Sequence, residues 1–189
     1  LILTTVNMIQ DSIQNKGEWP FNQYGPFWAM PFSLITYPLP HDLVFITLRI
    51  MTVGFYFLTG FLIYHLAKLI STTRIAFLSL LIFFLSQPFV SDFGSNLVPW
   101  PSAVIMPMFV LVVLLFFRIS VGTGTNRQIK CYSYICGILV CGIFFSRAQI
   151  GFLMFLTFIF LLLFKHRITA AVFFVLGFLS LTLILVSFL

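Results

Sequence analysis

The sequence predicts an all-α protein: a polytopic bundle of transmembrane helices with short amphipathic helices and an irregular proline- and aromatic-rich loop on the non-cytoplasmic face. Of its 189 residues, 61% are hydrophobic and 7% are charged, against about 45–50% and about 25% in an average soluble domain. This composition excludes a soluble globular domain, a disordered chain and a nucleic-acid-binding module. The apolar runs are continuous and lack the alternation of barrel strands, and a helix satisfies its own backbone in lipid.

Residues 1–42 precede the apolar runs, and we expect them to form a separate non-cytoplasmic segment. Thr4–Lys16 predicts a short amphipathic helix, because its apolar residues recur on one helical side. Such a helix lies on the membrane surface, and Gly17 is placed to end it. Residues 17–42 are dense in proline, glycine and aromatic residues, which predicts an irregular, rigid surface loop instead of a helix.

Residues 43–189 are expected to form one transmembrane bundle of about six hydrophobic segments, since a span needs about 20 largely apolar residues. Because the chain has no initiator Met and residues 173–189 end inside an apolar run, we expect a truncated part of a longer protein. The predicted segments are Leu43–Leu66, Ile75–Pro88, Ala103–Phe117, Tyr132–Ser146, Ala148–Phe164 and Ile168–Leu189.

Basic residues lie on alternate connections between these segments. Seven of the ten Lys and Arg residues fall on the first, third and fifth connections, and the positive-inside rule makes that side cytoplasmic. The non-cytoplasmic side then receives residues 1–42, the loop 89–102 and Arg147. The seven basic residues are Lys68, Arg74, Arg118, Arg127, Lys130, Lys165 and Arg167.

Arg147 is the most informative charge, because it interrupts a long apolar stretch on the side that has few cations. The flanking segments are short for full spans, which predicts a tight hairpin whose tip, residues 146–151, is buried among other helices. An ionisable residue at such a position needs a partner, and a lipid phosphate or diphosphate suits a guanidinium. The alternative is that Arg147 snorkels to the lipid head groups.

Arg49 lies about two turns inside the first span, counted from the same non-cytoplasmic end. It is a second candidate for binding a phosphate, or for pairing with Asp42 or Asp92. The alternative is an internal ion pair that only holds helices together.

The acidic residues all map to the non-cytoplasmic face. A carboxylate there would take a proton from an acceptor hydroxyl or hold a divalent metal ion, and the alternative for each one is solvated surface. The sequence leaves the cofactor open, with a divalent metal ion as the one candidate. The four acidic residues are Asp11, Glu18, Asp42 and Asp92.

No dedicated metal site is predicted. The three His residues are scattered over both sides, and the sequence has no CxxC, GxSxG, HExxH or Walker pattern. Cys131, Cys136 and Cys141 do not share a helix face, and we expect small buried residues at all three positions.

Several short elements, taken in order, resemble the GT-C glycosyltransferases, the multi-span enzymes that use polyprenyl-phosphate sugars. Residues 7–20 (NMIQDSIQNKGEWP) resemble the amphipathic stretch, ending in Gly and an aromatic/Pro cluster, that follows the family's first span. Residues 23–27 (QYGPF) resemble its YGPL-like or PPL-like element. Residues 43–69 and 86–88 resemble its second span and the end of its third. Residues 145–151 (FSRAQIG) resemble its short hairpin tip with a basic residue and Gly.

The resemblance implies an integral membrane glycosyltransferase. Such an enzyme transfers a sugar from a polyprenyl-phosphate donor to a lipid, glycan or protein acceptor. It would work on the periplasmic or extracellular face of a bacterial inner membrane, among membrane lipids. The resemblance also implies that Arg147, with Arg49, holds the donor phosphate. Asp11 would stand in for the family's acidic motif and activate the acceptor hydroxyl, unless that motif lies upstream of Leu1. The implied pocket residues are Glu18, Trp19, Tyr24, Trp28, Asp92 and Gln149.

Two other classes of function remain open. A transporter or flippase for lipid-linked glycans would show repeated halves with broken helices; the sequence has no internal repeat, and Pro107 is its one clear mid-span breaker. A non-catalytic membrane subunit would tolerate the replacement of Arg147 and Arg49 by Ala.

Overall fold

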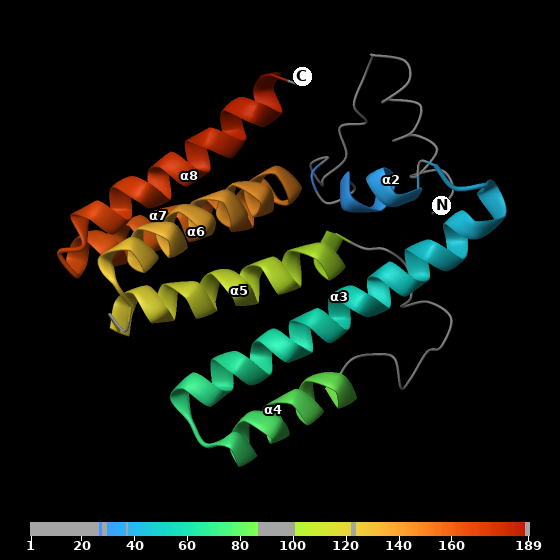
Figure 1. The fold of residues 1–189 in the computed structure, drawn as a ribbon, viewed down its shortest axis with the longest axis horizontal. Helices are drawn as coiled ribbons and strands as arrows, with labels where there is room; N and C mark the ends of the chain where they lie inside the picture. The colour runs from blue at the N-terminus through green and yellow to red at the C-terminus, as the bar shows by residue number, and fades with distance from the viewer. Residues whose placement is uncertain (1–26, 28–29, 37, 87–100, 122–123, 188–189) are drawn as a thin grey trace. The chain divides into compact units, whose positions relative to one another are not determined.

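A computed structural model describes residues 27, 30–36, 38–86, 101–121 and 124–187, and regular secondary structure in these residues is helical throughout (Figure 1). The all-α expectation is confirmed. The helices are α2 (Met30–Thr36), α3 (His41–Ile70), α4 (Thr73–Ser86), α5 (Pro101–Val121), α6 (Asn126–Ser146), α7 (Ala148–Phe164) and α8 (Ile168–Ser187).

Six of these helices coincide with the six predicted segments. The bounds of α7 agree with the prediction to the residue, because a basic residue follows or precedes the apolar run at each end. Helix α6 begins six residues earlier than Tyr132, at Asn126. The reason is a capping box: the Thr125 hydroxyl accepts from the Gln128 N–H, and the Gln128 side chain accepts from the Thr125 N–H. A cap of this kind stabilises a polar first turn that hydropathy alone does not detect.

The chain divides into two units, Leu1–Pro107 and Met108–Leu189. The first unit contains α2, α3, α4 and the start of α5, up to Pro107. Helices α3 and α4 are consecutive and pack against each other, with Gly60 of α3 against the Phe84 ring of α4. Helix α2 packs on α3 through the rings of Phe32 and Phe55, whose centroids are 5.7 Å apart. The expected boundary after residue 42 stays a prediction.

Helix α2 corrects the expectation of an irregular segment over residues 17–42. Its seven residues are helical although Pro31 is the second of them. Proline is tolerated there because the N–H groups of a helix's first turn have no intrahelical acceptor and the proline φ suits a helix start. The Thr36 hydroxyl donates to the Phe32 carbonyl (2.8 Å) and is buried in the last turn.

The second unit contains the rest of α5 together with α6, α7 and α8 (Figure 1). Helices α6 and α8 run parallel and make the closest contact of the unit. A Cβ on Gly137 would strike the Phe174 carbonyl, and a Cβ on Gly177 would strike the Tyr134 carbonyl. Small residues at such positions let two membrane helices approach backbone to backbone.

Helices α7 and α5 complete the second unit. Helix α7 packs antiparallel on α6, and its buried residues, Gly151, Met154, Phe158 and Leu162, follow one helical face. Helix α5 contacts α7 and α6. The centroids of the Phe116 ring in α5 and the Phe158 ring in α7 lie 4.5 Å apart. The Cys136 thiol of α6 lies 3.8 Å from the Val112 carbonyl of α5.

Two smaller expectations are settled by α5 and α6. Helix α5 continues through Pro107, which is buried, so this residue does not break the helix. Cys136 and Cys141 are buried as expected, whereas Cys131 is exposed and corrects that expectation.

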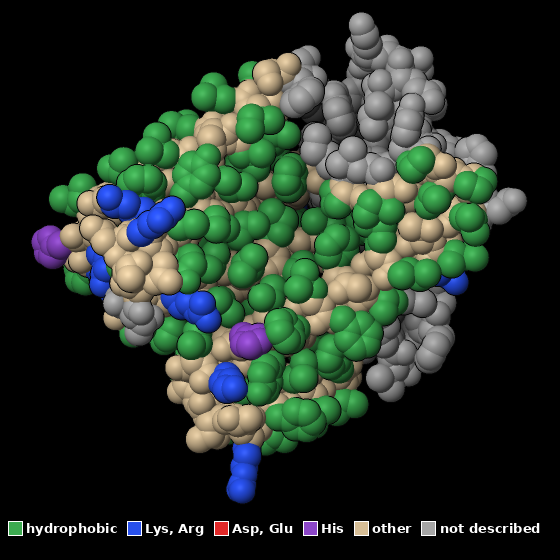
Figure 2. All heavy atoms as spheres, in the orientation of Figure 1, with side chains coloured by type: hydrophobic (Ala, Val, Ile, Leu, Met, Phe, Trp, Pro, Cys, Tyr) green, Lys and Arg blue, Asp and Glu red, His purple; other side chains and the backbone are tan. Residues whose placement is uncertain are grey.

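Four helices are long and apolar enough to cross a membrane: α3 from Ile46, α5 from Ala103, α6 and α8; α4 and α7 are apolar but shorter. Large hydrophobic side chains such as Phe57, Phe160 and Leu183 are exposed on the helix surfaces, and they cover much of the face in Figure 2. Lys and Arg gather at helix ends (Figure 2). These features fit a multi-pass integral membrane protein.

Candidate functional site

Arg147 forms the whole connection between α6 and α7. Its backbone is extended, with φ −144° and ψ 94°, so the chain reverses direction over this one residue. The Arg147 N–H donates to the Ile143 carbonyl (2.7 Å), and the Gly151 N–H donates to the Arg147 carbonyl (3.0 Å). The last turn of α6 and the first turn of α7 therefore share this residue, and its Cα position is set by both helices.

Small residues on each side make this tight reversal possible. The Ser146 side chain is fully buried and its hydroxyl donates to the Gly142 carbonyl (2.8 Å) within α6. Gly151 is buried against the backbone of Phe144, where any Cβ would overlap main-chain atoms. Because backbone atoms cannot move aside as a flexible side chain can, a glycine at position 151 is a steric requirement of this hairpin.

The hairpin tip is only partly buried, which corrects the expectation of a buried tip. Ser146 and Gly151 are buried, Arg147 is half-buried, and Ala148 and Gln149 are exposed. Gln149 lies in the first turn of α7, two residues after Arg147.

Arg147 lies at the opposite end of the second unit from its other basic residues. Helix α6 begins beside Arg127 and Lys130 and ends at Arg147, and α7 returns to Lys165. Residues 108–189 contain six of the ten Lys and Arg residues and no Asp or Glu, whereas residues 1–107 contain four of each sign. The charge asymmetry predicted from the loops is therefore present within one packed unit.

Helix α7 is short for a membrane span. Its 17 residues correspond to about 26 Å at about 1.5 Å per residue, against a hydrocarbon core of about 30 Å. When Lys165 lies at one membrane surface, Arg147 therefore lies a few ångströms below the other surface, within reach of phosphate groups.

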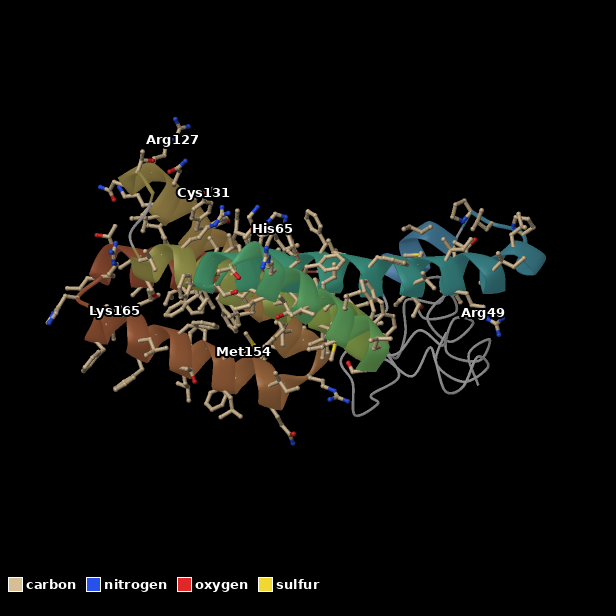
Figure 3. All side chains as sticks on the ribbon, turned by 90° about the horizontal axis from the view of Figure 1, so that it is seen from below. Arg49, His65, Arg127, Cys131, Met154 and Lys165 are labelled. Carbon is tan, nitrogen blue, oxygen red and sulfur yellow. The ribbon has the colours of Figure 1, made fainter. Side chains whose placement is uncertain are left out.

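Arg49, the second predicted donor-binding residue, belongs to the first unit. It lies in the third turn of α3, is half-buried and extends from the helix in Figure 3. His65 and Lys68, at the other end of the same helix, continue the predicted charge pattern. Because Arg49 and Arg147 belong to different units, the joint phosphate site expected from the sequence stays a prediction.

The remaining predicted site residues lie outside the described part of the chain, as does the predicted helix Thr4–Lys16. Of the residues that the structure describes, no three His, Cys, Asp or Glu side chains gather to hold a metal ion. The site residues concerned are Asp11, Glu18, Trp19, Tyr24, Trp28 and Asp92.

Sequence reasoning missed two polar contacts between α6 and α8. The Tyr134 hydroxyl donates to the Ser180 hydroxyl (3.0 Å), and the Cys141 thiol lies 3.3 Å from the Thr182 hydroxyl. The spacing of these residues could have predicted the contacts. Tyr134, Gly137 and Cys141 fall on one face of a helix, and this face continues from Lys130.

No family model, no curated protein and no solved structure matches the chain.

Proposed function

We propose that the protein is, or forms part of, an integral membrane glycosyltransferase that takes a sugar from a polyprenyl-phosphate donor. The observation that carries the proposal is the half-buried Arg147, set between two helices at the sparsely charged end of its unit. The guanidinium would bind the donor phosphate on the non-cytoplasmic side. The acceptor would be a lipid, a glycan or a protein.

The chemistry of the hairpin tip suits a phosphate. A guanidinium presents several N–H donors in a planar fork that matches phosphate oxygens. Arg147 is also the N-cap of α7, and the first N–H groups of a helix can donate to an anion. Gln149, two residues after Arg147, is exposed, and its side-chain amide adds a neutral hydrogen-bond donor. These groups would hold the leaving phosphate as charge develops on it.

The other steps of the proposed reaction rest on the sequence. Asp11, or a carboxylate upstream of Leu1, would take the proton from the acceptor hydroxyl, and a divalent metal ion would suit the same carboxylates. Trp19 or Trp28 would stack on a sugar, and Arg49 would be a second phosphate ligand.

The test is sugar transfer by the full-length protein in liposomes, with a radiolabelled polyprenyl-phosphate sugar as donor. Arg147→Ala should lower turnover about 10- to 100-fold, the value of a hydrogen bond to a charged group. Arg147→Lys should restore only part of it, because an ammonium cannot bind in the bidentate mode. Arg74→Ala, an exposed cation at the start of α4, is the matched control and should leave transfer unchanged.

Three outcomes would count against the proposal. Unchanged transfer in Arg147→Ala would remove this residue from the mechanism. Full activity in Arg147→Lys would favour simple snorkelling, for which either cation serves. Movement of a labelled lipid-linked glycan across the liposome bilayer, without any transfer product, would replace the transferase by a transporter.

A further inference from the structure

The ends of four helices place six basic side chains at one end of the second unit, which we call the basic end. Arg118 comes from the last turn of α5, and Arg127 and Lys130 come from the first turns of α6. The remaining three form the connection between α7 and α8. In Figure 3, Arg127 and Lys165 extend from this end. The six residues are Arg118, Arg127, Lys130, Lys165, His166 and Arg167.

The α7–α8 connection holds its basic residues in fixed positions. His166 adopts a left-handed backbone with φ 54°. The Arg167 N–H donates to the Leu162 carbonyl and the His166 N–H to the Leu163 carbonyl, both at 2.9 Å. This pair of bonds is a Schellman motif, which closes a helix end rigidly. The backbone positions of Lys165 and Arg167 are therefore set, two residues apart, by this turn.

Packing also positions Lys130. Its ammonium lies 5.6 Å from the centre of the Phe173 ring in α8, so the side chain bridges two helices. The positive dipole ends of α6 and α8 lie at the same end, because both helices begin there. Because α5 and α7 end here, their negative dipole ends oppose these positive ends, so the cationic side chains supply the attraction for an anion.

The sequence of the second unit contains no acidic side chain that could pair with these basic residues. Residues 108–189 contain no Asp or Glu, so the basic end has no side-chain carboxylate within its own unit. By contrast, the α3–α4 connection has only two basic residues, Lys68 and Arg74. The basic end therefore has the stronger requirement for an external anion.

The surroundings of the basic end indicate a lipid. Phe164 and Ile168 flank the α7–α8 connection and are 74% and 65% exposed. A cation beside exposed apolar side chains at the end of membrane-length helices matches a phosphate head group with its acyl chains. We propose that the basic end binds the head groups of anionic phospholipids in the leaflet that it contacts. This inference is independent of the proposed sugar transfer.

The test compares lipid enrichment around the full-length protein in nanodiscs made of equal parts phosphatidylglycerol and phosphatidylcholine. After transfer to detergent, the phospholipids retained by the protein are quantified by mass spectrometry. We expect wild-type protein to retain phosphatidylglycerol preferentially. Each basic residue beside an anionic surface strengthens binding about fivefold, so K165Q/R167Q should lower the preference by up to about 25-fold. The comparison variant K68Q/R74Q, at a connection with only two basic residues, should lower the preference less.

Two further measurements secure the result. Circular dichroism checks that K165Q/R167Q keeps its helices, and if it does not, Arg127→Gln, an exposed single change in the first turn of α6, takes its place. High salt should also weaken the preference in wild-type protein, since the Debye length falls from about 8 Å at about 0.15 M to about 3 Å at 1 M. Equal retention of both lipids by the wild type, or equal loss in both double variants, would overturn the proposal.

Discussion

His166 is a single residue whose backbone conformation its side chain disfavours. Its φ of 54° is the left-handed region, which costs an L-residue roughly 1–2 kcal/mol relative to the right-handed one. Glycine avoids that cost and is the usual residue at this position of a Schellman motif. The turn keeps a histidine there, between Lys165 and Arg167, at some expense in stability.

Replacing His166 by Gly should therefore stabilise the protein. We expect a gain of up to about 1 kcal/mol in unfolding free energy, after the extra chain entropy of glycine is subtracted. Thermal unfolding in detergent, followed by circular dichroism, measures it. Lys165→Gly is the control: with φ −82° it has no strain to relieve, so the change should destabilise. A lower unfolding temperature for His166→Gly would contradict the strain argument.

At the scale of helices, the α6–α8 pair organises the second unit. Gly137 and Gly177 each lie against the backbone of the other helix. This approach lets Tyr134 reach Ser180 and Cys141 reach Thr182 across the interface. Association in lipid depends on such close packing and polar contacts, because lipid tails are as apolar as the helix surfaces.

A single methyl group should be enough to disturb this pair. Gly137→Ala and Gly177→Ala would each place a Cβ on carbonyl atoms of the facing helix, and overpacking of this kind costs about 1–3 kcal/mol. The measurement is the loss of folded protein on heating, followed by size-exclusion chromatography in detergent.

Gly54→Ala is the same chemical change at a site in α3 where nothing lies within 4 Å of the added Cβ. Alanine favours helix over glycine by about 0.8–1 kcal/mol, so this variant should be as stable as the wild type or more so. If Gly137→Ala and Gly177→Ala were no less stable than Gly54→Ala, the close α6–α8 contact would not limit the stability of the protein.

At the scale of the whole molecule, charge and span length predict the orientation in the membrane. The net charge of +6 equals the charge of residues 108–189 alone, because residues 1–107 carry four charges of each sign. Helix α6 has 21 residues, about 32 Å at about 1.5 Å per residue, which is enough to cross the hydrocarbon core. Its two ends should therefore face opposite sides.

Cysteine labelling measures this orientation. Cys131→Ser removes the exposed native thiol, and Asn126→Cys or Gln149→Cys then adds one exposed thiol at either end of α6. In intact cells, an impermeant maleimide should label Gln149→Cys but not Asn126→Cys; inverted vesicles should give the reverse. Labelling of both from one side would contradict a membrane-crossing α6. If intact cells were labelled at Asn126→Cys and not at Gln149→Cys, Arg147 would face the cytoplasm, and this result would contradict the proposed function.

Prediction from sequence succeeded where a helix boundary coincides with a charge. Arg147 and Lys165 bracket α7, and both ends were located from hydropathy. It failed for α2, where Pro31 in a first turn is compatible with a helix, and for the start of α6, where Thr125 caps a polar turn. Arg147 could be singled out because an isolated charge is conspicuous in an apolar run. The exposure of Gln149 could not be predicted from the sequence, because it depends on how α7 folds back on α6.

The membrane-helical class, the six apolar segments and the uneven distribution of charge follow from the sequence by itself, since each depends on local composition. The tertiary structure alone decided which helix faces meet: Gly137 with α8, Gly151 with Phe144, and four helix ends in the basic end. The physical reason is that these helices are apolar on all sides. Hydrophobicity therefore cannot distinguish a face against lipid from a face against another helix; only close backbone approach between residues distant in sequence selects the partners.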